Sequence, residues 1–212
     1  MIVTDAVSGY LSGLRPAPDE VLSEMEAQAM VEQIPIVMPD TGALLHVLAL
    51  ASAARRVIEV GTAIGVSTLY LARALPEGGT VVSFEIDEAR HAAARDYLGR
   101  AGVLARADLR LQDAREGLAQ LSGTFEMAFV DGVKSQYGDY FDALLPLLAP
   151  GAVLAVDNVL MSGTVAEGRS DGHWSDEQIA TARAFNERLL GDGRLTGTVT
   201  PIGDGVLVAV RR

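Results

Sequence analysis

Short apolar runs alternate with longer helical runs along most of this chain, and this rhythm constrains the fold more than any other feature. Five runs are predicted as strands, at residues 57–60, 80–85, 108–111, 125–130 and 152–156. The segments after the first four strands are predicted as helices, at residues 66–74, 88–100, 115–121 and 137–148. Continuous apolar strands between helices indicate a parallel sheet that helices cover on both faces.

The last part of the chain departs from this rhythm. A predicted helix at 176–190 is followed by two predicted strands, at 194–200 and 205–210, which are joined through the turn PIGDG. That connection is too short for a crossover helix, so the two strands are expected to pair as an antiparallel hairpin. The predicted fold class is therefore α/β, with a seven-stranded, mostly parallel sheet that ends in an antiparallel hairpin.

No linker or repeat divides the sequence, so we expect a single domain over residues 1–212. Three predicted helices, at roughly 4–13, 18–32 and 41–53, precede the first strand and form an N-terminal cap over residues 1–54. The cap is expected to pack over the mouth of a Rossmann-like core, residues 55–212.

Charge and composition exclude several classes of partner. The formal net charge of −11 opposes binding to nucleic acid or to an anionic membrane, because both need clustered Lys and Arg. Without cysteine, neither a disulfide framework nor a Cys-ligated metal can form. The first residues lack the pattern of a signal peptide, and the apolar runs are too short to span a membrane, so a cytoplasmic location is expected.

A glycine-containing turn, in the sequence VIEVGTAIGVS, follows the first predicted strand. Gly61 and Gly65 lie where the strand leads into a helix, at the carboxyl edge of the sheet, which is where open α/β sheets bind ligands. The spacing differs from the Gly-x-Gly-x-x-Gly of dinucleotide-binding turns, and Glu59 suits a cationic amino acid group better than a pyrophosphate. A turn that needs glycine for packing alone is the alternative interpretation.

Glu85 ends the second predicted strand, about 20 residues beyond the glycine turn, where an acidic side chain can accept hydrogen bonds from ribose hydroxyls. Asp87 is better placed to cap the following helix. The pair indicates a nucleoside site without naming the nucleoside, since a nicotinamide cofactor would fit equally well.

Polar residues also follow the fourth and fifth predicted strands. Asp131 and Lys134 come just after the fourth strand, and Asp157 and Asn158 just after the fifth. Because these strands are expected to be neighbours, two carboxylates and an amide oxygen should meet beside the nucleoside site, and such hard ligands suit Mg²⁺. Each residue also has an ordinary alternative role, since Asp and Asn are common where strands end.

Five segments together resemble the family-3 O-methyltransferases, which include catechol and caffeoyl-CoA O-methyltransferases and bacterial relatives. The segments are EVGTAIGVS, FEID, FVDGVKSQYGDY, LLPLLAPGAVLAVDNVLMSGTV and PIGDGVLVAV. The similarity is collinear from near Gly9 to the end of the chain. It implies a class I methyltransferase fold, S-adenosylmethionine (SAM) as co-substrate, Mg²⁺ or a similar ion as cofactor, a small phenolic acceptor and a homodimer.

The resemblance also implies roles for single residues. Asp131, Asp157 and Asn158 would ligate the metal, and Lys134 would be the base that takes the proton of the acceptor hydroxyl. The implied contacts with SAM are Glu59, Gly61, Thr62 and Ser67 on its methionine part, Glu85 on its ribose, Ala114 by its adenine, and Val37 and Asp131. The usual family motif reads Asp-Ala-Asp-Lys, whereas this chain has Gly132 and Val133 between Asp131 and Lys134, so the cofactor contact made there is backbone-only or altered.

This set of groups suits methyl transfer to a phenol. A phenol with a pKa of about 10 is largely protonated at neutral pH, and a metal ion on two vicinal oxygens favours the phenolate. The alternatives are a SAM methyltransferase with a non-catechol acceptor, a nicotinamide-dependent oxidoreductase and a binding module without activity. The sequence does not reveal the acceptor, which the N-terminal helices and the loop at 162–175, with His173 and Trp174, are expected to enclose unless that loop is mobile.

Overall fold

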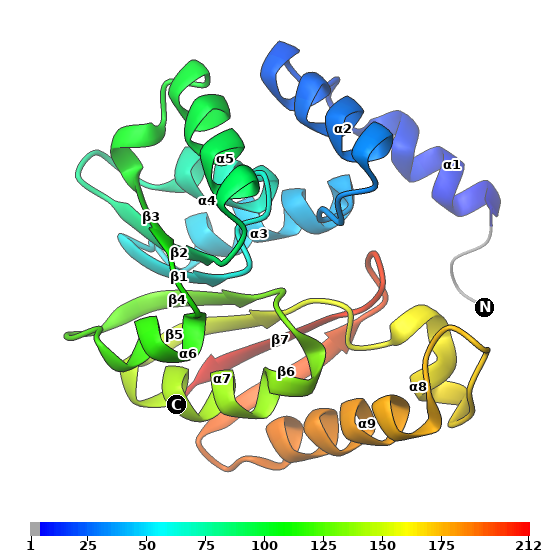
Figure 1. The fold of residues 1–212 in the computed structure, drawn as a ribbon. Coiled ribbons are helices and arrows are strands. Elements are labelled where there is room, and N and C mark those ends of the chain that lie inside the picture. The colour runs from blue at the N-terminus through cyan, green and yellow to red at the C-terminus, as the bar shows by residue number, and fades with distance from the viewer. Residues whose placement is uncertain (1–4) are drawn as a thin grey trace.

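The computed structural model describes residues 5–212, which form a seven-stranded sheet covered by helices (Figure 1). The strands are β1 (Arg56–Val60), β2 (Thr80–Glu85), β3 (Ala107–Leu111), β4 (Phe125–Val130), β5 (Leu148–Val156), β6 (Leu195–Thr200) and β7 (Val206–Arg211). Their order across the sheet is β3-β2-β1-β4-β5-β7-β6. The first five strands run parallel, while β7 is antiparallel to both β5 and β6. The predicted fold class, including the terminal hairpin, is confirmed.

The described residues form the helices α1 (Asp5–Leu14), α2 (Glu20–Glu32), α3 (Pro39–Ala51), α4 (Val66–Ala74), α5 (Glu88–Arg100), α6 (Ala114–Ala119), α7 (Tyr137–Leu144), α8 (Thr164–Glu167) and α9 (Asp176–Gly191). Short 3-10 turns are η1 (Leu104–Arg106), η2 (Lys134–Gln136), η3 (Leu145–Leu147) and η4 (Met161–Gly163). Figure 1 shows α3, α4 and α5 on one face of the sheet and α6, α7 and α9 on the other. None of the helices within residues 5–212 has the length and apolar character needed to cross a membrane.

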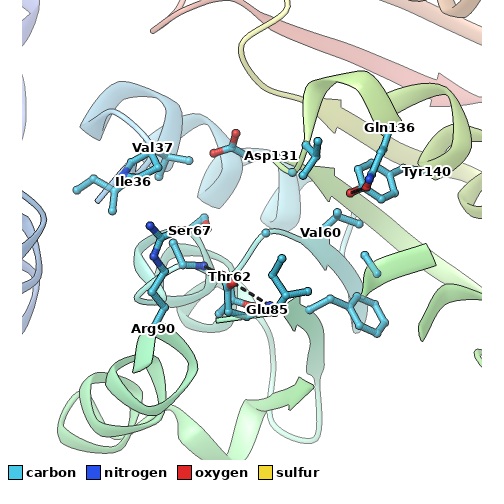
Figure 2. Close-up of a pocket in the computed structure, with 18 of the residues that line it drawn as sticks. Ile36, Val37, Val60, Thr62, Ser67, Glu85, Arg90, Asp131, Gln136 and Tyr140 are labelled. Carbon is cyan, nitrogen blue, oxygen red and sulfur yellow. Dashed lines mark hydrogen bonds between the residues drawn. The ribbon is translucent and has the colours of Figure 1, made fainter. Parts of the chain in front are cut away.

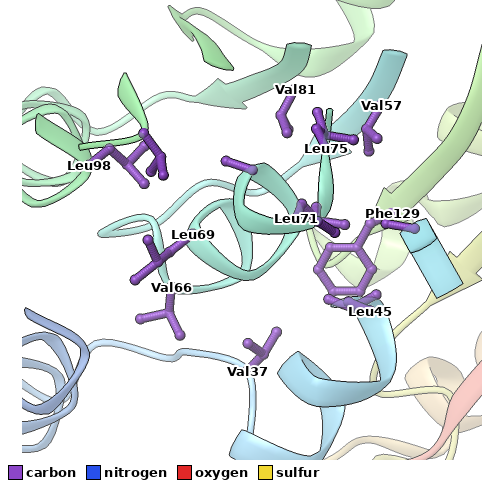
Figure 3. Packing of buried hydrophobic residues seen from close by; sticks show 14 of the residues in the cluster. Val37, Leu45, Val57, Val66, Leu69, Leu71, Leu75, Val81, Leu98 and Phe129 are labelled. Atoms are coloured by element: carbon purple, nitrogen blue, oxygen red, sulfur yellow. The ribbon is translucent and has the colours of Figure 1, made fainter. Parts of the chain in front are cut away.

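Alternation along the strands divides the core into two layers. On β1, Val57 belongs to the buried cluster beneath α3, α4 and α5, while the next residue, Ile58, belongs to the cluster beneath α6, α7 and α9. Both are fully buried, as a strand with helices on both faces requires. In Figure 3 the side chains of α4 lie among those of the strands, α3 and α5, so α4 is the centre of the first layer.

Most predicted elements are confirmed, and α4, β2, α5 and β4 have the predicted bounds. The prediction for 137–148 and 152–156 is wrong in its boundary, because α7 ends at Leu144 and β5 already begins at Leu148. Pro150 and Gly151 do not stop a helix there. They lie inside β5, at an irregularity where Leu148 pairs with Phe125 and regular pairing resumes further along, and Gly151 has φ +83°. The bulge accommodates the proline that would break a regular ladder.

The N-terminal helices are present, and α2 and α3 have defined packing partners in the core. The first predicted helix began at residue 4, which is outside the described residues, and α1 is described from Asp5. The helix α3 packs mainly on α4, and α2 packs on α4 and α5. It is the connection between α2 and α3 that reaches the mouth, through Pro35, Ile36 and Val37. The division at residue 54 stays a prediction.

Candidate functional site

The turns that leave β1, β4 and β5 are tied to one another at the carboxyl edge of the sheet. Asp131 N donates to Val60 O at 2.9 Å, and Asp157 N donates to Val130 O at 2.9 Å. Each strand therefore fixes the first residue of the turn beside it. The carboxyl ends of parallel strands meet at this edge, so the polar residues predicted from separate segments lie together.

The glycine turn is required by a close approach of backbone. Gly61 has φ +96°, and a Cβ at this position would lie 2.2 Å from the backbone oxygen of Asp131. Gly65 has φ +93° and is the N-cap of α4. Two interpretations of these glycines were open, a ligand that approaches the backbone and packing alone. The structure shows that the backbone at the end of β4 passes directly against Gly61, and this close approach already requires glycine.

A cavity of about 350 Å³, here the first cavity, opens at this edge between the ends of β1, β2 and β4 and the segment before α3. Of the predicted cofactor-binding residues, its wall contains Val37, Gly61, Thr62, Ser67, Glu85, Ala114 and Asp131. Figure 2 shows Ile36 and Val37 on one side of this cavity and Gln136 and Tyr140 on the opposite side. Glu59 is the exception, since it is fully buried and does not line the cavity.

Glu85 is held in a fixed orientation by backbone donors. Ala63 N donates to its Oε2 at 2.8 Å, while Ile86 N and Asp87 N donate to its Oε1 at 2.8 and 2.9 Å. A carboxylate offers about four acceptor positions, so roughly one remains for a ligand hydroxyl, on Oε2. Asp87 caps α5, as predicted, by accepting from Arg90 N.

Glu59 lies beneath the first cavity in a buried hydroxyl network. Its Oε2 accepts from the hydroxyls of Thr68 and Ser83, and Thr62 Oγ1 lies 2.5 Å from Ser83 Oγ. Its other oxygen, Oε1, is buried and has no hydrogen-bond partner. Burial raises the pKa of Glu59 to about 7, against the lowering effect of hydroxyls that include Ser67. A positive group near this carboxylate would offset the cost of burying its charge.

Asp131 and Asp157 follow neighbouring strands, since Val130 and Val156 are paired in the sheet. Burial raises the pKa of both carboxyl groups. For Asp157, which is 3% exposed, the nearby negative charge of Asp131 adds to the effect of burial and the pKa is about 7. A cation beside these two carboxyl groups would offset the cost of charging Asp157, which the neighbouring charge of Asp131 increases.

Asn158 and Lys134 complete this group. Asn158 has φ +57°, a left-handed conformation that turns its side chain out of line with β5, and its Oδ1 accepts from Lys134 Nζ at 2.9 Å. Asn158 N donates to the Oδ1 of Asp157 at 2.8 Å. Tyr137, which burial gives a pKa well above its usual value, donates its hydroxyl hydrogen to the backbone oxygen of Asp157 at 3.1 Å.

The donor set fits a hard divalent cation such as Mg²⁺. Two carboxylates and one amide oxygen are the ligand types that Mg²⁺ takes, with water or ligand oxygens in the remaining positions. Among residues 5–212 no cluster of three or more His, Cys, Asp or Glu side chains is placed to hold a metal, and the group described here contains only two carboxylates. A metal at this edge would therefore need Asn158 as a third protein ligand, with oxygens of water or of the acceptor in the remaining positions.

A second cavity, also of about 350 Å³, lies between η2, the segment after β5, Trp174 and α9. Gly132, Val133, Lys134 and Asn158 line both cavities. Lys134 Nζ lies 5.7 Å from the centre of the Trp174 ring, so the tryptophan stands at the same junction. The two cavities thus meet at the predicted base and a predicted metal ligand.

Sequence reasoning missed several residues of these walls. Gln136 lines the first cavity, as does Arg90 in the first turn of α5. The wall formed by α9 was not foreseen either, because a polar amphipathic helix carries no motif. His46 lies on α3 with its Nδ1 3.0 Å from Tyr70 O and lines neither cavity.

Comparison with known proteins adds an independent finding. A family model described as O-methyltransferase matches residues 16–212. A catechol O-methyltransferase from Niastella koreensis is 32% identical over 204 residues, which cover 93% of this chain and 90% of that protein. The O-methyltransferase TomG from Streptomyces achromogenes, involved in tomaymycin synthesis and solved in complex with SAM, has a TM-score of 0.86 and 34% identity and covers 97% of this chain and 96% of its own. An O-methyltransferase from Bacillus cereus in complex with SAH has a TM-score of 0.86 and 31% identity, with coverage of 98% and 97%.

Proposed function

Because the chain belongs to the O-methyltransferase family whose model matches residues 16–212, we propose that it methylates one of two vicinal oxygens on a small phenolic acceptor at a divalent-metal centre. That it is a SAM-dependent O-methyltransferase of the catechol and caffeoyl-CoA type follows from the family itself. This membership removes the nicotinamide-dependent oxidoreductase as an alternative. The acceptor, the metal and the residue roles are the proposal.

The observation that carries the proposal is the junction of the two cavities at Lys134 and Asn158. Methyl transfer is an in-line displacement, so donor and acceptor must approach each other from opposite sides of one point. SAM in the first cavity and the acceptor in the second would meet at this junction. The volumes, about 350 Å³ each, lie near the lower end of the range for small-molecule sites, which suits a single aromatic ring in the second cavity.

In the first cavity, Glu85 is assigned to the ribose and Ala114 to the adenine of SAM. The acceptor position left on Glu85 Oε2 suits one strong hydrogen bond from a ribose hydroxyl. Glu59 is assigned to the cationic methionine end. It acts from beneath the cavity, since Thr62, which lines the cavity, lies 2.5 Å from Ser83 Oγ, the hydroxyl that donates to Glu59. The ammonium group of SAM would lie above Glu59, and its positive charge would offset the cost of burying this carboxylate.

At the junction, Asp131, Asp157 and Asn158 would hold the metal. A bound Mg²⁺ polarises acceptor oxygens and favours the phenolate. Lys134 is assigned as the base: its Nζ takes the proton of the acceptor hydroxyl. The oxygen then attacks the methyl carbon, the bond from sulfur to methyl breaks as the bond from oxygen to methyl forms, and the electron pair stays on sulfur in the departing S-adenosylhomocysteine. Trp174 lines the second cavity beside Lys134.

The test is methyl transfer from labelled SAM to catechol, to phenol and to 2-methoxyphenol, each with Mg²⁺ and with a chelator. We expect catechol alone to be methylated, because phenol and 2-methoxyphenol lack the pair of ionisable vicinal oxygens. We also expect this methylation only when the metal is present. Equal rates for all three, or rates that a chelator leaves unchanged, would show that a non-catechol acceptor or a metal-free site is the right description.

We also propose that the protein acts as a homodimer through its N-terminal helices. Large apolar side chains are exposed there, including Tyr10 (68%), Met30 (78%) and Val31 (78%). Exposed apolar side chains in such number on neighbouring elements are typical of surfaces that bind protein. Light scattering during size-exclusion chromatography measures the mass, and a monomer at all working concentrations would contradict this part.

A further inference from the structure

Arg90, in the first turn of α5, lines the first cavity and has no role in the site described so far. Its side chain is half-buried and, within residues 5–212, makes no hydrogen bond, ion pair or ring contact. Every other arginine in that range except Arg95 has such a partner in the protein. A guanidinium offers five N–H donors, so Arg90 brings unused donors and a free positive charge to the wall of this cavity.

The stability of α5 does not explain this arginine. The N-terminus of a helix favours negative charge, and this one has it, since Asp87 is the N-cap and Glu88 lies in the first turn. Arg90 lies in the same turn, where a positive charge is unfavourable. A contact with a ligand in the cavity would offset that unfavourable position.

The charges around the first cavity leave Arg90 as the place for an anionic group. Arg90 and Lys134 are the only cationic side chains among the described residues of its wall, and Lys134 stands at the junction with the second cavity. Near the glycine turn the charges are negative, with Glu85 and Asp131 in the wall and Glu59 beneath it. An anionic group of a ligand is therefore repelled there and attracted to Arg90.

SAM carries a single anionic group, the α-carboxylate of its methionine part. The ammonium group is bonded to the same carbon, so a methionine part at the glycine turn brings the carboxylate close to the acidic side chains. Figure 2 shows the Arg90 side chain on the side of the cavity where Val37 and Ser67 lie, and Ser67 is predicted to contact the methionine part. A guanidinium can donate two parallel hydrogen bonds to a carboxylate.

We propose that Arg90 binds the α-carboxylate of SAM and thereby makes the protein select a methyl donor that has this group. The inference rests on the proposed position of SAM in the first cavity, and it does not depend on the metal or the acceptor. The charge of the carboxylate does not change during methyl transfer, so the contact is the same in SAM and in S-adenosylhomocysteine. Arg90 should therefore affect the affinity and the KM for SAM rather than kcat.

The test compares SAM with decarboxylated SAM, S-adenosyl-3-methylthiopropylamine, which keeps the ammonium and sulfonium groups and lacks only the carboxylate. Calorimetry measures the affinity of the full-length protein for each. We expect the wild type to bind SAM about tenfold or more tightly than the decarboxylated ligand. Without a cation for the carboxylate the order should be the reverse, because the acidic wall and the net charge of −11 favour the ligand with fewer negative charges.

Arg90→Gln should lower the affinity for SAM by about tenfold and leave the affinity for decarboxylated SAM unchanged. Arg90→Lys keeps the charge without the planar pair of donors and should lose about threefold for SAM alone. The side chain has no partner in the protein, so folding should not depend on it. The matched control is Arg95→Gln, because Arg95 is an exposed arginine of the same helix that likewise has no partner and lines neither cavity. It should bind both ligands as the wild type does.

Three results would overturn the inference. They are a wild type that binds decarboxylated SAM as tightly as SAM, a loss in Arg90→Gln that is equal for the two ligands, and an affinity for SAM that Arg90→Gln leaves unchanged. Since calorimetry needs neither acceptor nor metal, a failure to methylate catechol would contradict the proposed function and would leave this measurement decisive.

Discussion

The buried carboxyl group of Glu59 should make the stability of the ligand-free protein depend on pH, and Glu59→Gln should remove that dependence. Burial raises the pKa of Glu59 from 4.5 to about 7. Between these values the folded protein binds the proton more tightly than the unfolded chain does, so the free energy of unfolding falls as the pH rises. The contribution is complete below 4.5 and is lost as the pH passes about 7. The difference between these two pKa values corresponds to about 3 kcal/mol.

Gln at this position keeps an oxygen that can accept from Thr68 and Ser83 and carries no titratable charge. From pH of about 5 to about 8, the unfolding free energy of the variant should therefore rise relative to that of the wild type by up to about 3 kcal/mol. Urea unfolding with linear extrapolation at several pH values measures both proteins. Asp157 also has a pKa of about 7, but it titrates in both proteins and cancels in the difference.

Two results bear on this reasoning. Parallel curves for the variant and the wild type across this range would refute it, since they would mean that Glu59 does not change its protonation. With SAM present, the proposed ammonium contact should stabilise the wild type at high pH more than the variant, because a ligand stabilises the folded state more when it binds more tightly. Glu187→Gln, an exposed change on α9, should follow the wild type throughout.

Three further outcomes can be measured. Lys134→Ala should lower kcat by about a hundredfold or more while calorimetry finds SAM affinity nearly unchanged, and an unchanged kcat would remove Lys134 from the mechanism. A chelator should abolish turnover and Mg²⁺ restore it, with Asp157→Asn raising the Mg²⁺ concentration needed; Mg²⁺ requirements that match in the two proteins would argue against ligation by Asp157. Gly61→Ala should cost more than about 2 kcal/mol of stability in urea, because its Cβ would lie 2.2 Å from the backbone oxygen of Asp131, and a smaller loss would mean that the turn can move away.

The sheet could be predicted because it is encoded locally and repeatedly. Buried parallel strands read as apolar runs, and the short PIGDG connection leaves a hairpin as the one geometry for its two strands. The start of β5 could not be predicted in the same way. Pro150 and Gly151 are residue types that normally end helices. Here they lie in a bulge, because β5 pairs with β4 through Phe125 and Leu148, which are 23 positions apart in sequence.

The candidate site was predictable to the extent that it follows strand ends. Asp131, Asp157 and Asn158 lie where β4 and β5 end, and position alone identified them. Glu59 was also identified as a candidate residue. Its position beneath the cavity was not predicted, because the alternation of residues along a strand does not tell which of them a ligand will touch. The wall from α9 depends on how a distant helix packs, and Glu177 and Asn186 have no sequence signal that distinguishes them from other polar residues of that helix.

The terminal hairpin, at first a marker of topology, also positions the site. The segment after β5 contains three residues other than glycine in the left-handed region, Asn158, Met161 and Ser162, and each such residue costs about 1–2 kcal/mol. The turn between β6 and β7 offsets this cost, since Val159 N donates to Gly205 O at 3.0 Å and Leu160 N to Asp204 O at 3.0 Å.

Asp204 adds a further bond through its side chain, which accepts from Ser162 N. The conformation that aims Asn158 at Lys134 is therefore maintained by a turn more than 40 positions later in the chain. A parallel strand in place of β7 would put a crossover helix where this turn lies and would leave these donors unpaired. The antiparallel end of the sheet is thus part of what allows Asn158 to face both cavities.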